Sequence, residues 1–156
     1  MTFQRFALQL SDHISSLLKS NFDATDVKSL QAPYASFVSA VPAFAYIGLF
    51  KTNDKGLIVA VDPKIIYVLA NRMMGGRGIM ERKTRPAFTL SEQFLGEEIM
   101  GFVQKKLAEA NAAIQLERIE HHISHVHYFY PSDPVTKTAM FCKFNNKSVG
   151  YIYVGH

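Results

Sequence analysis

The sequence predicts a single α/β (α+β) domain in which helices cover a β-sheet. Two long segments carry apolar residues at helical spacing, and several short runs alternate between apolar and polar residues, with turn residues around them. Hydrophobic residues make up 48% and charged residues 19%, as in an ordinary globular chain, and no linker or low-complexity segment divides it. We therefore expect one domain, residues 1–156, with a similar order of elements in each half.

The first third predicts a helix, a strand and a second helix. The amphipathic helix covers roughly residues 3–20, and its apolar positions are Phe3, Phe6, Leu10, Ile14, Leu17 and Leu18. Residues 26–31 predict a short strand, and residues 34–41 a short helix that ends before Pro42. Strands at 44–50 and 57–61 follow, joined by the turn at 52–56.

Asp62 and Pro63 predict the start of the next helix, because Asp caps free backbone N–H groups and Pro fits the first helical position. Its inward positions are Ile65, Ile66, Leu69, Ala70 and Met73, and Gly75 and Gly76 end it. Residues 75–87 then form a basic loop that ends at Arg85–Pro86.

Thr89 and Glu92 form a predicted capping box at the start of a long helix that reaches about residue 111. Its predicted buried stripe is Leu95, Ile99, Phe102, Val103, Leu107 and Ala110. Gly96 and Gly101 cost helix stability, which indicates close approach of a neighbouring molecule or of the chain's own sheet. Strands follow from about residue 114, with the last turn at 145–147.

Composition restricts the function classes. The net charge of +4 permits an acidic partner without requiring nucleic acid, and the single Cys142, expected in the core, suits a reducing compartment. No signal peptide is visible, and the longest apolar run, residues 36–50, is too short to span a bilayer. We expect a soluble cytoplasmic protein without cofactor, membrane insertion or nucleic-acid partner.

The segment Asn71–Gly78 is the main candidate site. Three glycines within four positions follow a helix and leave backbone open to close approach, with Arg77 as a cation among them. This pattern predicts a docking surface formed by Asn71, Arg72, Met74, Gly75, Gly76, Arg77 and Gly78. A purely structural helix cap at Gly75 is the alternative. A phosphate site is disfavoured because such loops precede a helix.

Two further patterns suggest weaker sites. Arg72, Arg77, Arg82, Lys83 and Arg85 form a basic patch without interleaved aromatic residues in the loop, which favours an acidic protein face over nucleic acid. On a strand, His121, His125 and His127 would share one face at a spacing that zinc can use. No acidic or cysteine ligand in phase completes that set, so a histidine-rich edge strand is the alternative.

The order of these motifs resembles the middle domain of the flagellar motor switch protein FliM. Residues 61–78 resemble the family's D-P-x-L-V-x-x-L-x-D-R-x-x-G-G-x-G pattern, and Phe88–Glu92 its F-T-x-x-E helix start. Residues 6–21, 34–42 and 130–134 resemble its first helix, its Y-x-x-F-x-x-S-x-P segment and its S-P-N-D-x turn. The resemblance is collinear over nearly the whole chain.

This resemblance implies a three-layer α/β/α domain with a central mixed sheet and pseudo-two-fold internal symmetry. It implies a non-catalytic module of the cytoplasmic ring, peripheral to the inner membrane at the flagellar basal body. There the G-G-x-G loop, residues 75–78, contacts the rotor protein FliG, with Asn71 and Arg72 in support. The domains self-associate side by side, by resemblance through helices 89–111 and 3–20, and FliN-like proteins join the full assembly.

Three departures qualify the resemblance. Asn71 stands where the family usually has Asp, which weakens a pairing with Arg72. The family's N-terminal CheY-binding peptide and its C-terminal FliN-like domain are expected to be absent.

The related CheC and CheX phosphatases act on CheY-phosphate through E-x-x-N on one helix, and neither long helix carries that spacing. A phosphatase, or a FliM-like paralogue with another partner, remains the alternative.

Overall fold

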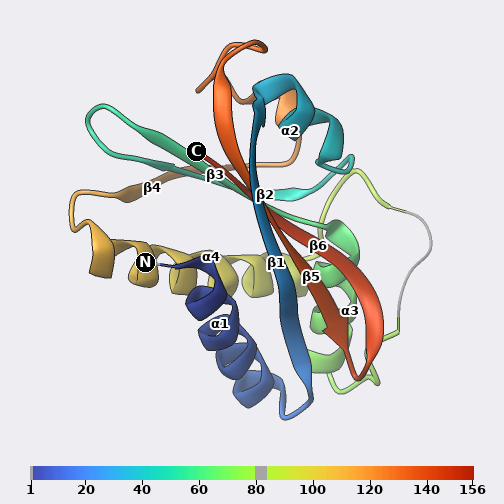
Figure 1. The fold of residues 1–156 in the computed structure, drawn as a ribbon. Helices are drawn as coiled ribbons and strands as arrows, with labels where there is room; N and C mark the ends of the chain where they lie inside the picture. Colours follow the sequence, from blue (N-terminus) through green and yellow to red (C-terminus); the bar gives the residue numbers. More distant parts are fainter. Residues whose placement is uncertain (1, 80–83) are drawn as a thin grey trace.

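The computed structural model describes residues 2–79 and 84–156. A six-stranded sheet with the order β1-β5-β6-β3-β2-β4 runs through them (Figure 1). Its strands are β1 Phe22–Pro33, β2 Tyr46–Lys51, β3 Gly56–Val61, β4 Gln115–Glu120, β5 Pro134–Phe144 and β6 Lys147–Gly155. Each described pair of neighbouring strands is antiparallel, so the sheet is antiparallel and not mixed as expected.

Helices lie on both faces of this sheet, which confirms the three-layer arrangement. Helices α1 Phe3–Leu18, α3 Pro63–Met73 and α4 Leu90–Ala110 pack on one face (Figure 1). The short helix α2 Tyr34–Ala40 and the segment around the 3₁₀ turn η1 Ile123–His125 pack on the other. A hydrophobic core lies on each face of the sheet, and successive residues of β2 and β3 point alternately into the two cores. On β3, Val59 and Val61 face the larger core, and Ile58 and Ala60 face the smaller one.

The strand order has the predicted pseudo-two-fold symmetry. The first half runs α1, β1, α2, β2, β3, and the second runs α4, β4, η1, β5, β6. If β1 is exchanged with β4, β5 with β2 and β6 with β3, the same strand order is obtained, read from the opposite edge of the sheet. The central β3–β6 pair, with Val59 opposite Val154, lies where the two halves meet.

Local signals explain where the helices begin. The side chain of Asp62 accepts the Lys64 N–H at 2.9 Å with Pro63 in the first turn. Thr89 and Glu92 form the predicted capping box at α4. Within the expected stripe of α4, Phe102 is only partly buried and Ala110 is exposed.

The two glycines of α4 have different surroundings. A Cβ at Gly96 would overlap the Tyr46 ring, so this glycine lets the helix pack on its own sheet. A Cβ at Gly101 would meet no atom within 4 Å. Packing within the molecule therefore accounts for Gly96, whereas Gly101 borders open space at the surface.

Two strand predictions differ from the structure. The strand expected at 26–31 is β1, which is longer because Phe22 and Ala24 pair with β5 ahead of a bulge. Asp26 has φ of +49° at this bulge. Residues 121–127 are not a strand and contain the 3₁₀ turn η1 instead.

Within residues 2–79 and 84–156, none of the helices combines the length and apolar character needed to cross a bilayer.

Candidate partner-docking site

Helix α3 ends in a left-handed glycine cap. The Gly75 N–H donates to the Arg72 carbonyl at 3.0 Å, and the Gly76 N–H donates to the Asn71 carbonyl at 2.9 Å. Gly75 has φ of +95°, a conformation that glycine adopts without strain. These two bonds form a Schellman motif, so the helix-cap alternative describes the start of the loop correctly. The cap also turns the following residues away from the helix axis.

The Asn71 side chain holds the rest of the loop. Its Oδ1 accepts the N–H of Gly78 at 3.0 Å and the N–H of Ile79 at 3.1 Å. A Cβ at Gly76 would overlap this carboxamide, and a Cβ at Gly78, whose φ is +81°, would overlap the Phe144 ring. Substitutions at these two glycines would therefore change the loop itself as well as any contact that it makes.

Arg72 joins the loop to the end of α1. Its Nε donates to the Leu18 carbonyl at 3.2 Å, and its terminal nitrogens lie 3.5 Å from the carbonyls of Lys19 and Gly76. A cation suits this position because the last carbonyls of a helix carry partial negative charge. A pairing between Arg72 and the side chain of residue 71 is expected to be weak with Asn at this position, and both side chains instead bond to backbone groups.

The outer side of this clamped loop is apolar and cationic. Met74 is 70% exposed and Ile79 is 67% exposed, and Arg77 is exposed between them. A cleft of about 260 Å³ lies beside the loop, between α3 and the start of α4. Its lining residues are Tyr67, Ala70, Asn71, Met74, Ile79, Thr89, Ser91 and Glu92. Ile79 extends the site beyond the predicted set.

Arg85 anchors the chain between the cleft and α4. Its guanidinium makes two hydrogen bonds to Glu92, at 3.0 and 2.6 Å, and lies 4.3 Å from the centre of the Tyr67 ring. Burial raises the pKa of Glu92, but the bonds from Arg85 and Thr89 outweigh it and leave that pKa below its ordinary value. Arg82 and Lys83 of the predicted basic patch lie outside the described residues.

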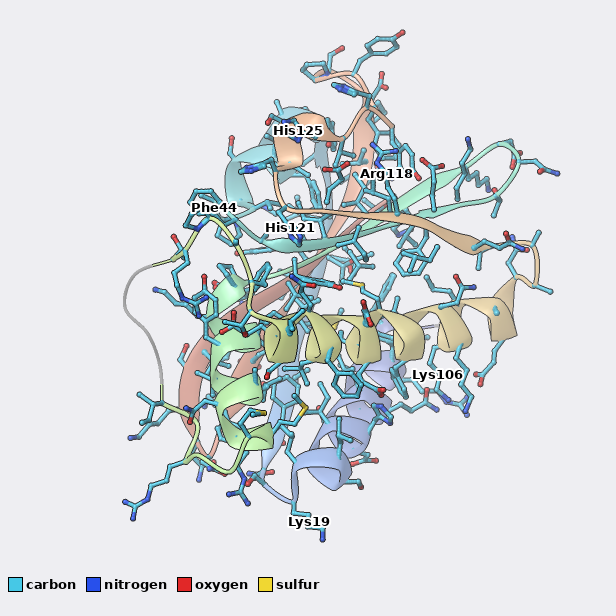
Figure 2. The ribbon with its side chains drawn as sticks, turned by 180° about the vertical axis from the view of Figure 1, so that it is seen from behind. Lys19, Phe44, Lys106, Arg118, His121 and His125 are labelled. Atoms are coloured by element: carbon cyan, nitrogen blue, oxygen red, sulfur yellow. The ribbon has the colours of Figure 1, made fainter. Side chains whose placement is uncertain are left out.

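The structure separates the predicted histidine set. His121 is partly buried and its ring contacts those of Tyr46 and Phe88, with centroids 5.5 and 5.1 Å apart. His125 lies on the 3₁₀ turn, its Nδ1 3.7 Å from Glu120 Oε2, apart from His121 (Figure 2). His127 follows that turn and is exposed. Across the described parts of the chain, no three potential metal ligands come together, so the shared face expected for His121, His125 and His127 is not formed.

Comparison with known proteins decides the family. The family model of the flagellar motor switch protein FliM matches residues 1–148. The chain belongs to the FliM family. Among curated relatives, FliM of Bacillus subtilis (strain 168) is 30% identical over 80 residues. That match covers 50% of this chain and 24% of the relative, so it spans about a quarter of the relative's length.

Solved structures agree on the fold of this FliM-family chain. A chain in the crystal structure of a FliG–FliM complex from H. pylori is similar, with a TM-score of 0.84 and 18% identity. The match covers 99% of this chain and 87% of that one. The chemotaxis protein CheX of Vibrio vulnificus is more distant, with a TM-score of 0.55, 10% identity, and coverage of 96% and 93%.

Proposed function

We propose that this chain is a non-catalytic flagellar motor switch module that docks a FliG-like rotor protein through residues 71–79. The observation that carries the proposal is the clamped loop, which exposes Met74, Arg77 and Ile79 beside a cleft. A preorganised apolar and cationic surface suits a protein contact, because the loop loses little conformational entropy when it binds. FliM-family membership supports this choice of partner.

The same proposal places the module on the cytoplasmic side of the flagellar basal body, within a ring of like domains that takes part in setting the direction of rotation. FliN-like proteins would join it in the full assembly. The phosphatase alternative has less support, because α1 and α4 lack the paired Glu and Asn that such an enzyme needs on one helix.

The test is calorimetric titration of this chain with the middle domain of FliG from the same organism. Arg77→Glu combined with Met74→Ala should weaken binding by at least tenfold, because loss of a hot-spot contact costs about 2 kcal/mol or more and tenfold corresponds to about 1.4 kcal/mol. Both side chains are exposed, so the melting temperature should change little. Lys55→Glu, in the β2–β3 turn, is the matched control and should bind like the wild type.

Two results would overturn the proposal. One is the absence of binding heat from the folded wild-type chain at two temperatures and at concentrations well above micromolar, because the heat-capacity change of apolar burial keeps the enthalpy from being zero at both. The other is unchanged affinity in the Arg77→Glu, Met74→Ala double variant, which would leave the loop as a helix cap only. Gly76→Val is a poorer probe, because its side chain would displace the Asn71 carboxamide.

A further inference from the structure

Three turns that are far apart in the sequence meet at one end of the molecule. They are the turn after α1, residues 19–21, the candidate docking loop, residues 71–79, and the β5–β6 turn, residues 145–146. The Arg72 side chain bonds to the backbone at the end of α1. The Asn145 N–H donates to the Asn21 carbonyl at 2.8 Å, and the Asn21 N–H donates to Asn145 Oδ1 at 3.3 Å. These bonds hold all three turns together at the lower end of Figure 1.

Each of these turns carries an exposed cation at or beside it. We define the cationic rim as Lys19, Arg77 and Lys147, all of which are exposed. Among residues 2–79 and 84–156, no carboxylate lies within 4 Å of any of the three charges. The Lys19 side chain points away from the body of the molecule at the lower end of Figure 2.

The Lys147 side chain emerges on the face of the sheet that carries the docking loop. The Phe144 ring faces the larger core and lies directly beside the Gly78 backbone. Lys147 stands opposite Phe144 across β5 and β6, and opposite residues of an antiparallel pair point to the same face. Val149, two residues along β6, is buried in the same core. The rim therefore borders the loop on the side of the β5–β6 turn as well as at the end of α1.

The negative charges near this end of the molecule do not neutralise the rim. Asp23 stands opposite Lys143 across β1 and β5, and both point to the other face of the sheet because Lys143 directly precedes Phe144. Asp12 lies about two helical turns back along α1. The last carbonyls of α1 and α3 carry partial negative charge, but the Arg72 guanidinium already bonds to carbonyls of both ends. The rim is therefore available to a negative charge from outside.

We infer that the cationic rim belongs to the same docking surface as residues 71–79 and receives an acidic surface of the FliG-like partner. The inference rests on the proposed function, and it adds the charge of the partner and two residues outside the loop, Lys19 and Lys147. Protein contacts commonly combine an apolar centre with a polar rim, and here the exposed Met74 and Ile79 supply the apolar part.

The chemistry of this surface favours a protein over a nucleic acid. The rim and residues 71–79 include no aromatic side chain on which a base could stack. Charges at the border of a contact act chiefly on the encounter of the two proteins, so they change the association rate and its dependence on salt. The apolar residues of the loop act chiefly on the dissociation rate. The two parts of the surface therefore have separate kinetic signatures.

The test is stopped-flow measurement of association with the middle domain of FliG from the same organism, at several salt concentrations. Lys19→Glu combined with Lys147→Glu should lower the association rate roughly tenfold at low ionic strength, because steering by complementary charge changes such rates by about 10- to 1,000-fold. Lys19→Gln combined with Lys147→Gln should give an intermediate rate. Added salt should slow the wild type and bring its rate close to that of the variants, because salt screens exposed charges.

Lys28→Glu combined with Lys55→Glu is the control with a matched change in net charge. Both lysines are exposed, Lys55 in the β2–β3 turn and Lys28 opposite Ala139 on the other face of the sheet. This control should associate at a rate close to that of the wild type. Circular dichroism should show that the rim variants and the control are folded.

Three results would overturn the inference, and they separate it from the proposed function. A rim variant with the rate and the salt dependence of the wild type would remove the rim from the docking surface, while loss of affinity in the Arg77→Glu, Met74→Ala variant would keep the loop in it. A rate lowered equally in the control would assign the effect to net charge instead of the rim. A folded wild-type chain that does not bind FliG would overturn the proposed function and this inference with it.

Discussion

At the residue scale, Asn71 is the side chain on which the geometry of the candidate site depends. One oxygen accepts two backbone N–H groups of the loop, from Gly78 and Ile79. The family's usual Asp offers the same acceptor at this position. The departure at residue 71 therefore keeps the hydrogen-bonding function and removes a charge.

Asn71→Ala should loosen the loop more than it destabilises the fold. Two lost hydrogen bonds cost roughly 1–2 kcal/mol in the free energy of unfolding. Amide hydrogen exchange at Gly78 and Ile79 should accelerate in this variant, while Asn71→Asp should stay close to the wild type. Equal protection of both amides in Asn71→Ala would show that the loop is held by other contacts.

Glu92 links stability to pH at the start of α4. Its pKa lies below the ordinary 4.5 in the folded chain, so the unfolded chain binds the proton more tightly. The stabilisation is complete above pH 4.5 and is lost as the pH falls from there through the folded pKa. Urea unfolding in this range should show a smaller pH dependence for Glu92→Gln than for the wild type, and an unchanged pH dependence would contradict this role of Glu92.

At the scale of one element, α4 contains two glycines with opposite expected responses. Gly96→Ala should destabilise by roughly 1–3 kcal/mol, because the new methyl group would overlap the buried Tyr46 ring. Gly101→Ala adds helix propensity in open space and should stabilise by about 0.5–1 kcal/mol. Thermal melting of both variants provides the comparison, and a stabilising Gly96→Ala would contradict the packing described for α4.

The elements differ in how far sequence could predict them. Helix α3, which begins at Asp62 and ends before Gly75, and the capping box of α4 are encoded by neighbouring residues, and both were predicted. The first part of β1 was missed because the bulge at Asp26 interrupts its alternation. The histidine segment had strand-like spacing, but Ile123 and Val126 pack into the smaller core in a turn.

The sequence predicts where the loop of the candidate site lies, but not the long-range contacts that hold it. The glycines and Arg77 lie in one short stretch, and Ile79, directly after it, was an available apolar signal. The anchor of Tyr67, Arg85 and Glu92 joins residues up to 25 positions apart through a ring contact and an ion pair. No local pattern encodes such a contact, because it forms only once α3 and α4 have packed.

At the scale of the whole molecule, Cys142 reports on global unfolding. It is the only cysteine of the chain, its side chain is fully buried, and burial raises the pKa of its thiol. A thiol reagent should therefore modify it only when β5 separates from the core. The labelling rate across urea concentrations should follow the unfolding measured by circular dichroism. Rapid labelling in native buffer would show that β5 opens locally.

The strand order also determines whether half of the chain could stand alone. Three of the five strand pairings, β1–β5, β3–β6 and β2–β4, join the first half to the second. Separate polypeptides of residues 1–79 and 84–156 would each lack the partners of these strands, so each should be unfolded on its own. Mixed, they should reassemble by fragment complementation, which makes this domain a candidate for a split reporter.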